Sequence, residues 1–275
     1  MQVEKPEKKK KVESRKKVLK TNENTDEYNN ESNEYPVELK ESERNDSEGE
    51  ETIQIQMRLG FIRKVYGILS IQLIITFGAV LLFQLPSIKN LIMAYQQMAG
   101  NVLIMCSLGF LVLFLILACN RKLSRTVPCN YIFLFAITLC EALACAIVSS
   151  IYSFPIVATA LVLTIITTLA LTFYACTTKT NFSSCRAGLY VAFCQIFMIG
   201  LIAVLFRLPA LYAVYTFSMT IVVGIYIVYD TQLIMAKFGI GYSVDDYIFA
   251  TLEIYMDIIR LFLLILRILG NSRRH

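Results

Sequence analysis

Long apolar segments dominate the chain after residue 52, and each is close to the length of a membrane crossing. A helix needs about 20 mostly apolar residues to span a bilayer. Six segments meet this condition clearly, and a seventh is apolar but carries four charged residues. Proline residues stand between several segments, where helices can stop or start. The pattern predicts seven spans, at about residues 66–85, 102–119, 129–150, 155–175, 187–206, 211–234 and 247–269.

The short connections between these spans predict an all-α membrane protein, a seven-transmembrane-helix bundle over residues 53–275. Residues 1–52 form a separate charged tail. Of the chain's 26 Lys and Arg residues, 11 lie in residues 1–51, together with 15 of its 21 Asp and Glu residues. So polar a segment cannot bury enough apolar surface to offset the entropy of ordering. We therefore expect a disordered tail.

Lysine and arginine residues near the span ends predict the orientation, because cytosolic loops carry an excess of them. Nine fall on one side of the membrane if the amino terminus is cytosolic, and two on the other. The pattern therefore predicts a cytosolic amino terminus and a multi-pass protein in contact with the lipid bilayer. Arg267, Arg273 and Arg274 are the exception, since seven spans place them on the opposite side.

Composition narrows the class of protein. The chain is 56% hydrophobic and 17% charged, which argues against a single soluble domain, a secreted disulfide scaffold and a nucleic-acid-binding protein. Its one histidine, His275, and the absence of a CxxC pair leave zinc chemistry and Ser-His catalysis without ligands or a base. We expect neither an enzyme nor a resident cofactor.

Four carboxylates lie inside the apolar segments, where charged groups are costly and often mark functional sites. Asp230 is near the cytosolic end of the sixth span, and Asp257 is about ten residues, or about 15 Å, into the seventh. Because the connection between them returns the chain on the same side, two adjacent helices can bring these aspartates together. Glu253 precedes Asp257 by one turn on the same face, and Glu141 lies midway along the third span.

Two carboxylates in a poorly solvated site do not ionise independently. They titrate as a unit, and can share one proton or lose it and accept a cation, for which calcium suits oxygen ligands. Asp230 and Asp257 are therefore a candidate pH-sensing and ion-gating site with calcium as the permeating ion. A structural interpretation stays open, in which Asp257 pairs with Arg260 and Asp230 bonds backbone near Thr231.

Four motifs follow one another along residues 55–270: Gly60-Phe-Ile-Arg-Lys-Val-Tyr66, Lys179-Thr-Asn-Phe182, Tyr229-Asp-Thr-Gln-Leu-Ile234 and Leu252-Glu-Ile-Tyr-Met-Asp-Ile-Ile259. Together they resemble the lifeguard family, the proteins with a transmembrane Bax-inhibitor motif. The resemblance implies seven helices with the last near the bundle centre. It also implies regulation of cell death and a pH-sensitive calcium leak, at the endoplasmic reticulum, the Golgi or the plasma membrane.

The resemblance maps the family's paired aspartates onto Asp230 and Asp257. We expect Glu141, Glu253 and Arg260 to be supporting residues of this site. Two residues depart from the family's pattern. Arg260 stands where relatives tend to be uncharged and would neutralise the pair, which counts against conduction. Glu253 counts in the opposite direction.

Three other classes of membrane protein compete with this interpretation. An intramembrane aspartyl protease would share Tyr229-Asp230, but its Gly-x-Gly-Asp motif is missing because Tyr242 follows Gly239-Ile-Gly241. A seven-helix receptor would carry Asn-Pro-x-x-Tyr in the last span, which is absent. A non-conducting protein that suppresses death signalling by binding receptors or other membrane proteins stays open beside the calcium leak. We favour the leak, which makes the chain a regulator of apoptosis and intracellular calcium homeostasis.

Overall fold

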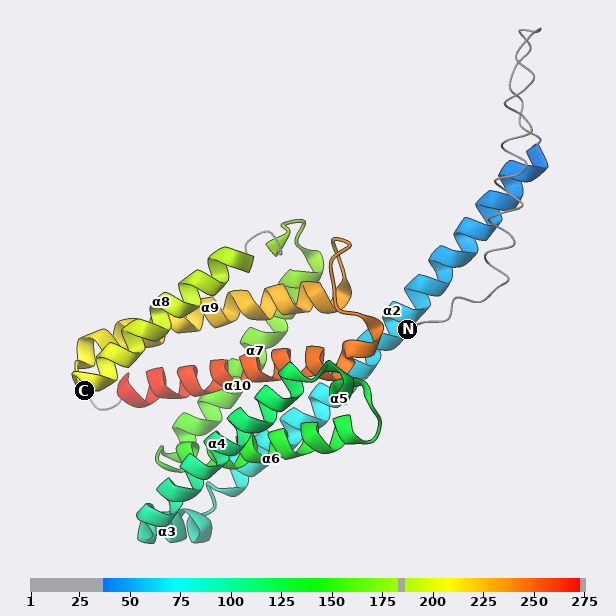
Figure 1. Ribbon diagram of the computed structural model, residues 1–275. Coiled ribbons are helices and arrows are strands. Elements are labelled where there is room, and N and C mark those ends of the chain that lie inside the picture. Colours follow the sequence, from blue (N-terminus) through cyan, green and yellow to red (C-terminus); the bar gives the residue numbers. More distant parts are fainter. Residues whose placement is uncertain (1–36, 183–185, 273–275) are drawn as a thin grey trace, which may run out of the picture. The chain divides into compact units, whose positions relative to one another are not determined.

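The computed structural model describes residues 37–182 and 186–272, and within these ranges the regular structure is helical, with no strand (Figure 1). This agrees with the predicted all-α class. The chain divides into two units, Met1–Thr52 and Ile53–His275, and the residues of the candidate site belong to the second. In order the elements are α2 (Val37–Leu82), α3 (Pro86–Ala94), α4 (Gln96–Cys119), α5 (Arg121–Arg125), α6 (Cys129–Ser150), α7 (Phe154–Thr177), α8 (Arg186–Leu205), α9 (Pro209–Met235), the 3₁₀ helix η2 (Val244–Asp246) and α10 (Tyr247–Ser272).

Six helices of the described residues are long and apolar enough to cross a membrane: Thr52–Leu82 within α2, and α4, α6, α7, α8 and α9. Each corresponds to one of the first six predicted spans, and α6 has the predicted bounds. The first and fifth predicted spans, 66–85 and 187–206, run past the helix ends at Leu82 and Leu205. At 26 residues α10 is long enough as well. Its four charged residues, Glu253, Asp257, Arg260 and Arg267, keep it out of that apolar set.

The tail differs from its prediction where the structure describes it. Residues 37–52 were expected to be disordered, but they continue α2. Glu, Lys and Arg are strong helix formers, and extending an existing helix needs no new nucleation. Residues 1–36 lie outside the described part, so their predicted disorder stays a prediction. The pattern also missed α3, whose nine residues begin at Pro86.

Helix ends follow local chemistry. Proline occupies the first turn of α3, α7 and α9, where its missing N–H costs nothing. At the other end of α9, Ala236 and Gly239 adopt positive φ values of 50° and 74° and turn the chain toward η2. Lys237 then donates to the carbonyls of Ala175, Cys176 and Thr178, which are acceptors at the end of α7. The lysine thus joins the α9–α10 connection to α7.

The centre of the second unit is α10, which packs against α9, α7 and α6 (Figure 1). Its side chains from Ile248 to Leu266 are mostly buried, and Tyr255, Ile259 and Phe262 are fully enclosed. This confirms the central position that the family resemblance implies for the last helix.

Two buried hydrogen bonds join α10 and its neighbours through polar side chains. Gln72 of α2 donates its amide N–H to Thr138 of α6 at 2.8 Å. Thr76, one turn further along α2, is 2.8 Å from the Tyr255 hydroxyl of α10. Since the Thr76 hydroxyl donates to the Gln72 carbonyl, the Tyr255 hydroxyl is the donor to Thr76. Polar contacts of this kind fix how α2, α6 and α10 register against one another.

Candidate functional site

The structure brings Asp230 of α9 and Asp257 of α10 together. They are 5% and 4% exposed, and their carboxyl groups lie within hydrogen-bonding reach of each other. A hydrogen bond between two carboxyl groups requires that one of them carries a proton. The geometry therefore provides a buried pair able to hold one shared proton.

Asp257 also faces Arg260 on its own helix. The Arg260 Nη1 atom is 3.7 Å from Asp257 Oδ1, which is an ion pair without a hydrogen bond. Asp257 Oδ2 is buried and has no hydrogen-bond partner among the described residues. Arg260 in turn lies over the ring of Phe193 from α8, 5.9 Å from its centroid. One oxygen of the pair is thus left without a donor.

The structural interpretation also expects Asp230 to bond backbone near Thr231. The Thr231 hydroxyl next to it donates to the Ile227 carbonyl at 2.7 Å, a bond within α9. Of the contacts in the structural interpretation, the structure contains the Asp257–Arg260 ion pair. The Thr231 hydroxyl is bonded within its own helix.

Glu141 and Glu253 have different surroundings, and the negative charge of Glu253 acts on Asp230. Glu141 is on α6, where the charge of Arg260 acts on it. Glu253 is one turn nearer the α9–α10 connection and accepts a hydrogen bond from the Tyr242 hydroxyl. No group of three His, Cys, Asp or Glu side chains able to hold a metal ion occurs among the residues that the structure describes. Neither glutamate is thus a third ligand beside the two aspartates.

Two arginines from other helices, Arg58 and Arg125, bind the connection between α9 and α10, and the sequence pattern did not predict these contacts. We call the contacts of these two arginines the strap. Arg58 of α2 donates to the carbonyls of Tyr242 and Leu233, both at 2.6 Å. Arg125 of α5 donates to both carboxylate oxygens of Asp246, at 2.8 and 2.9 Å. These hydrogen bonds and the negative charge of Asp246 raise the pKa of Arg125. Both arginines are among the nine Lys and Arg residues whose positions predict the orientation, and no local pattern predicts their distant acceptors.

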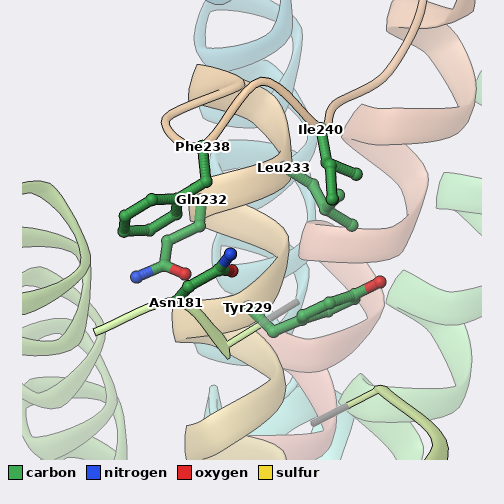
Figure 2. Close-up of a pocket in the computed structure, with 6 residues that line it drawn as sticks. All are labelled: Asn181, Tyr229, Gln232, Leu233, Phe238 and Ile240. Atoms are coloured by element: carbon green, nitrogen blue, oxygen red, sulfur yellow. The ribbon is translucent and has the colours of Figure 1, made fainter. Parts of the chain in front are cut away.

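A small pocket lies at the same end of α9. Figure 2 shows Tyr229, Gln232 and Leu233 on α9, with Phe238 and Ile240 on the connection above and Asn181 beside Gln232. About 10 Å³ of it is open to a water-sized molecule, which is room for a single water. Gln232 closes one side, because its amide bonds the backbone of Thr180 and Phe182. The pocket is therefore too small for an organic ligand.

Comparison with known proteins places this arrangement in a family. The sequence model of a family described as "Inhibitor of apoptosis-promoting Bax1" matches residues 58–274, which include both aspartates. The chain belongs to the lifeguard family of Bax inhibitors. The lifeguard resemblance of its motifs is thereby confirmed, and the match spans the second unit.

Individual lifeguard proteins are similar over most of their length. Human protein lifeguard 3 is 30% identical over 224 residues, which cover 78% of this chain and 70% of the relative. Mouse protein lifeguard 4 is 31% identical over 215 residues, covering 78% and 86%. The Golgi anti-apoptotic protein of Vaccinia virus strain Lister is 31% identical over 222 residues, covering 80% and 89%.

Proposed function

We propose that this lifeguard protein restrains apoptosis from an intracellular membrane and does so as a pH-sensitive calcium leak, with Asp230 and Asp257 as its gate. The observation that carries the proposal is the buried aspartate pair, in which Asp257 Oδ2 has no donor among the described residues. A buried acceptor without a partner is costly, so such an atom is suited to a ligand that comes and goes. A cation or a proton fits it.

The cellular role is proposed by analogy with the relatives. One is named a Golgi anti-apoptotic protein, and the matching family is described as an inhibitor of apoptosis. Since the similarity covers the whole membrane unit of the chain, we propose the same role here. The Golgi and the endoplasmic reticulum are the proposed locations, with the plasma membrane as a further site. Membrane proteins of the death pathway are the proposed partners.

We further propose α10 as a seventh crossing, with the amino terminus in the cytosol. Its 26 residues correspond to about 39 Å of helix. Its first residue, Tyr247, follows Asp246, which is bound by Arg125, whereas Arg267 near its end lies over the ring of Tyr212 at the start of α9. The two ends of α10 thus meet opposite ends of the bundle. A crossing helix with these charges is tolerable because Asp257 and Arg260 pair.

The proposed gate works through the shared proton. With one proton between them the carboxyl groups bond to each other and the site carries one negative charge. When that proton leaves, the two carboxylates repel and their oxygens become available to a cation. Calcium takes six to eight oxygen ligands, so two carboxylates would bind it weakly and let it pass. The leak should therefore increase as pH rises.

The test is calcium efflux from liposomes that contain the purified full chain, measured from about pH 5 to about pH 8. Asp230→Asn and Asp257→Asn should each remove the pH dependence. Asp245→Asn is the matched control, because this exposed aspartate lies on the connection and outside the pair. If folded wild-type protein gives no flux at any pH, the leak is refuted.

The Asp257–Arg260 ion pair supports a second candidate, a non-conducting protein that suppresses death signals by binding other membrane proteins. In that case the ion pair holds α10 in place, and the aspartates need not change their protonation. Death suppression in cells that survives Asp230→Asn together with Asp257→Asn would favour this candidate over the leak.

A further inference from the structure

The connection between α9 and α10 runs over the small pocket at the end of α9 and is anchored on both sides of it (Figure 2). At the α9 end, Lys237 donates to the last carbonyls of α7. At the α10 end, Asp246 accepts two hydrogen bonds from Arg125. Residues 239–243 between these anchors belong to no helix or strand, and four of the five are exposed. We call this segment the lid.

Arg58 of α2 holds the lid against α9. Its Nη1 atom donates to the Tyr242 carbonyl in the lid, and its Nη2 atom donates to the Leu233 carbonyl on α9, both at 2.6 Å. The guanidinium lies over the ring of Phe61, 4.7 Å from its centroid, which fixes its place on α2. A planar group with several fixed donors can reach two acceptors at once, and a lysine ammonium lacks this geometry.

The lid lies so close to α9 that position 241 requires glycine. A Cβ atom on Gly241 would be 2.6 Å from the Leu233 carbonyl oxygen and 2.7 Å from the Cβ atom of Ala236, and it would also collide with the Arg58 guanidinium. Gly239 begins the lid with a φ of 74°, a conformation that glycine adopts without strain. The lid is therefore closed on the last turn of α9, with a natural hinge at its first residue.

The lid also contacts both helices that carry the aspartate pair. Leu233, whose side chain lines the pocket, is one turn from Asp230 on the same face of α9. On the side of α10, the Tyr242 hydroxyl donates to Glu253, one turn before Asp257. With the lid closed, the pocket has room for a single water. Calcium keeps six to eight oxygen ligands, so it cannot pass this point with its water shell.

We propose that this pocket is the entrance of the calcium path at the α9–α10 end of the bundle, and that Arg58 keeps it closed by bonding the lid to α9. The inference rests on the proposed leak and deepens it. When Arg58 releases either carbonyl, the lid turns about Gly239 while both anchors stay in place, and the pocket widens. Arg58 Nε is buried without a partner among the described residues, so the closed position carries a cost that opening removes. Arg58 is a positioning residue, since it contacts the lid and not the ion.

The first test is calcium flux in liposomes that contain the full chain, with folding checked by thermal unfolding. Arg58→Gln should raise the flux by about tenfold, because the hydrogen bonds that close the lid are lost. Arg63→Gln is the matched control, since this arginine is exposed on the same helix, and it should leave the flux unchanged.

A second readout follows the lid without relying on conduction. In a Leu233→Cys background, a charged maleimide should label position 233 about fivefold faster when Arg58→Gln is added, because labelling follows the population of the open lid. Mass spectrometry of individual peptides separates this site from the native cysteines, and exposed Cys119 on α4 serves as the internal reference, with an unchanged rate.

Arg58→Lys separates closure of the lid from simple repulsion of cations by a positive charge. Lysine keeps the charge but not the double contact, so flux and labelling should both rise as they do in Arg58→Gln. If Arg58→Lys instead behaves like wild type while Arg58→Gln conducts more, the charge alone controls entry and the proposal is overturned.

A change in the lid itself keeps the test decisive if the arginine variants fold poorly. Gly241→Ala should raise flux and labelling because its Cβ prevents closure, whereas Gly60→Ala, which faces open space near Arg58, should change neither. Wild-type flux that stays the same in Arg58→Gln and in Gly241→Ala would refute this inference and leave the leak standing. Absence of flux from folded wild type at every pH would refute both.

Discussion

The amide of Gln72 is paired at one end only, and this makes an unusual prediction for stability. Gln72 is 3% exposed; its Nε2 donates to Thr138, while its Oε1 has no partner among the described residues. The Thr138 hydroxyl cannot serve Oε1, because it already donates to the Leu134 carbonyl at 2.8 Å. The orientation of the amide is therefore fixed, with its acceptor unpaired.

Replacing Gln72 with methionine, which has a similar length and no amide, should stabilise the protein. The change loses one interhelical hydrogen bond, worth about 0.6 kcal/mol between membrane helices. It also removes a buried acceptor without a donor, which costs about 1–3 kcal/mol. The balance is a gain of about 1 kcal/mol in the free energy of unfolding. Thr138→Val does the opposite, since it leaves both ends of the amide unpaired, and should cost about 1–2 kcal/mol.

The assay is unfolding of the purified full chain in mixed micelles by rising SDS, followed by the loss of helical circular dichroism. Gln72→Met, Thr138→Val and the double variant complete a cycle. In the methionine background Thr138→Val should cost about 0.5 kcal/mol or less, because its partner is gone. If Gln72→Met instead destabilises by about 1 kcal/mol or more, Oε1 has a donor in the membrane and the reasoning is wrong.

Three further predictions concern the ends and packing of the bundle. Lys237→Met should destabilise by about 1 kcal/mol and speed hydrogen exchange at the end of α7, whose carbonyls it caps. Gly200→Ala should cost about 1–3 kcal/mol in thermal unfolding, because a Cβ there meets an aromatic ring of α9 at 2.6 Å, whereas Gly188→Ala, which faces open space, should not destabilise. Arg125→Gln should speed exchange in the α9–α10 connection. Since Asp246 raises the already high pKa of Arg125, the charged form persists and wild-type protection should stay constant from about pH 6 to about pH 9 and weaken in high salt.

Hydropathy predicted most of the bundle, because membrane helices must be apolar along their whole length. That constraint gave the bounds of α6 and the positions of five other helices. It could not decide the status of α10, because hydropathy counts each charged residue as unfavourable and does not register that Asp257 and Arg260 pair along the helix. It also underestimated α2, since a charged sequence can be helical without being apolar.

The aspartate pair was predictable for a topological reason. Asp230 and Asp257 flank one short connection, so their helices are neighbours and their depths can be counted from the turn. The contacts of the strap could not be predicted, because Arg58 and Tyr242 are 184 residues apart. The acceptor is also a backbone carbonyl, a group that every residue has, so no residue type marks it. Arg125 and Asp246 are separated by 121 residues and belong to elements too short to show a pattern.

The central place of α10 has a consequence for biosynthesis. This helix is the last of the described helices to leave the ribosome, yet it fills the interior that the others surround. The earlier helices therefore enter the bilayer before their core is present, and their buried polar groups wait for partners that have not been made. Since a helix with four charges inserts poorly by itself, we expect α10 to enter with the help of the helices made before it.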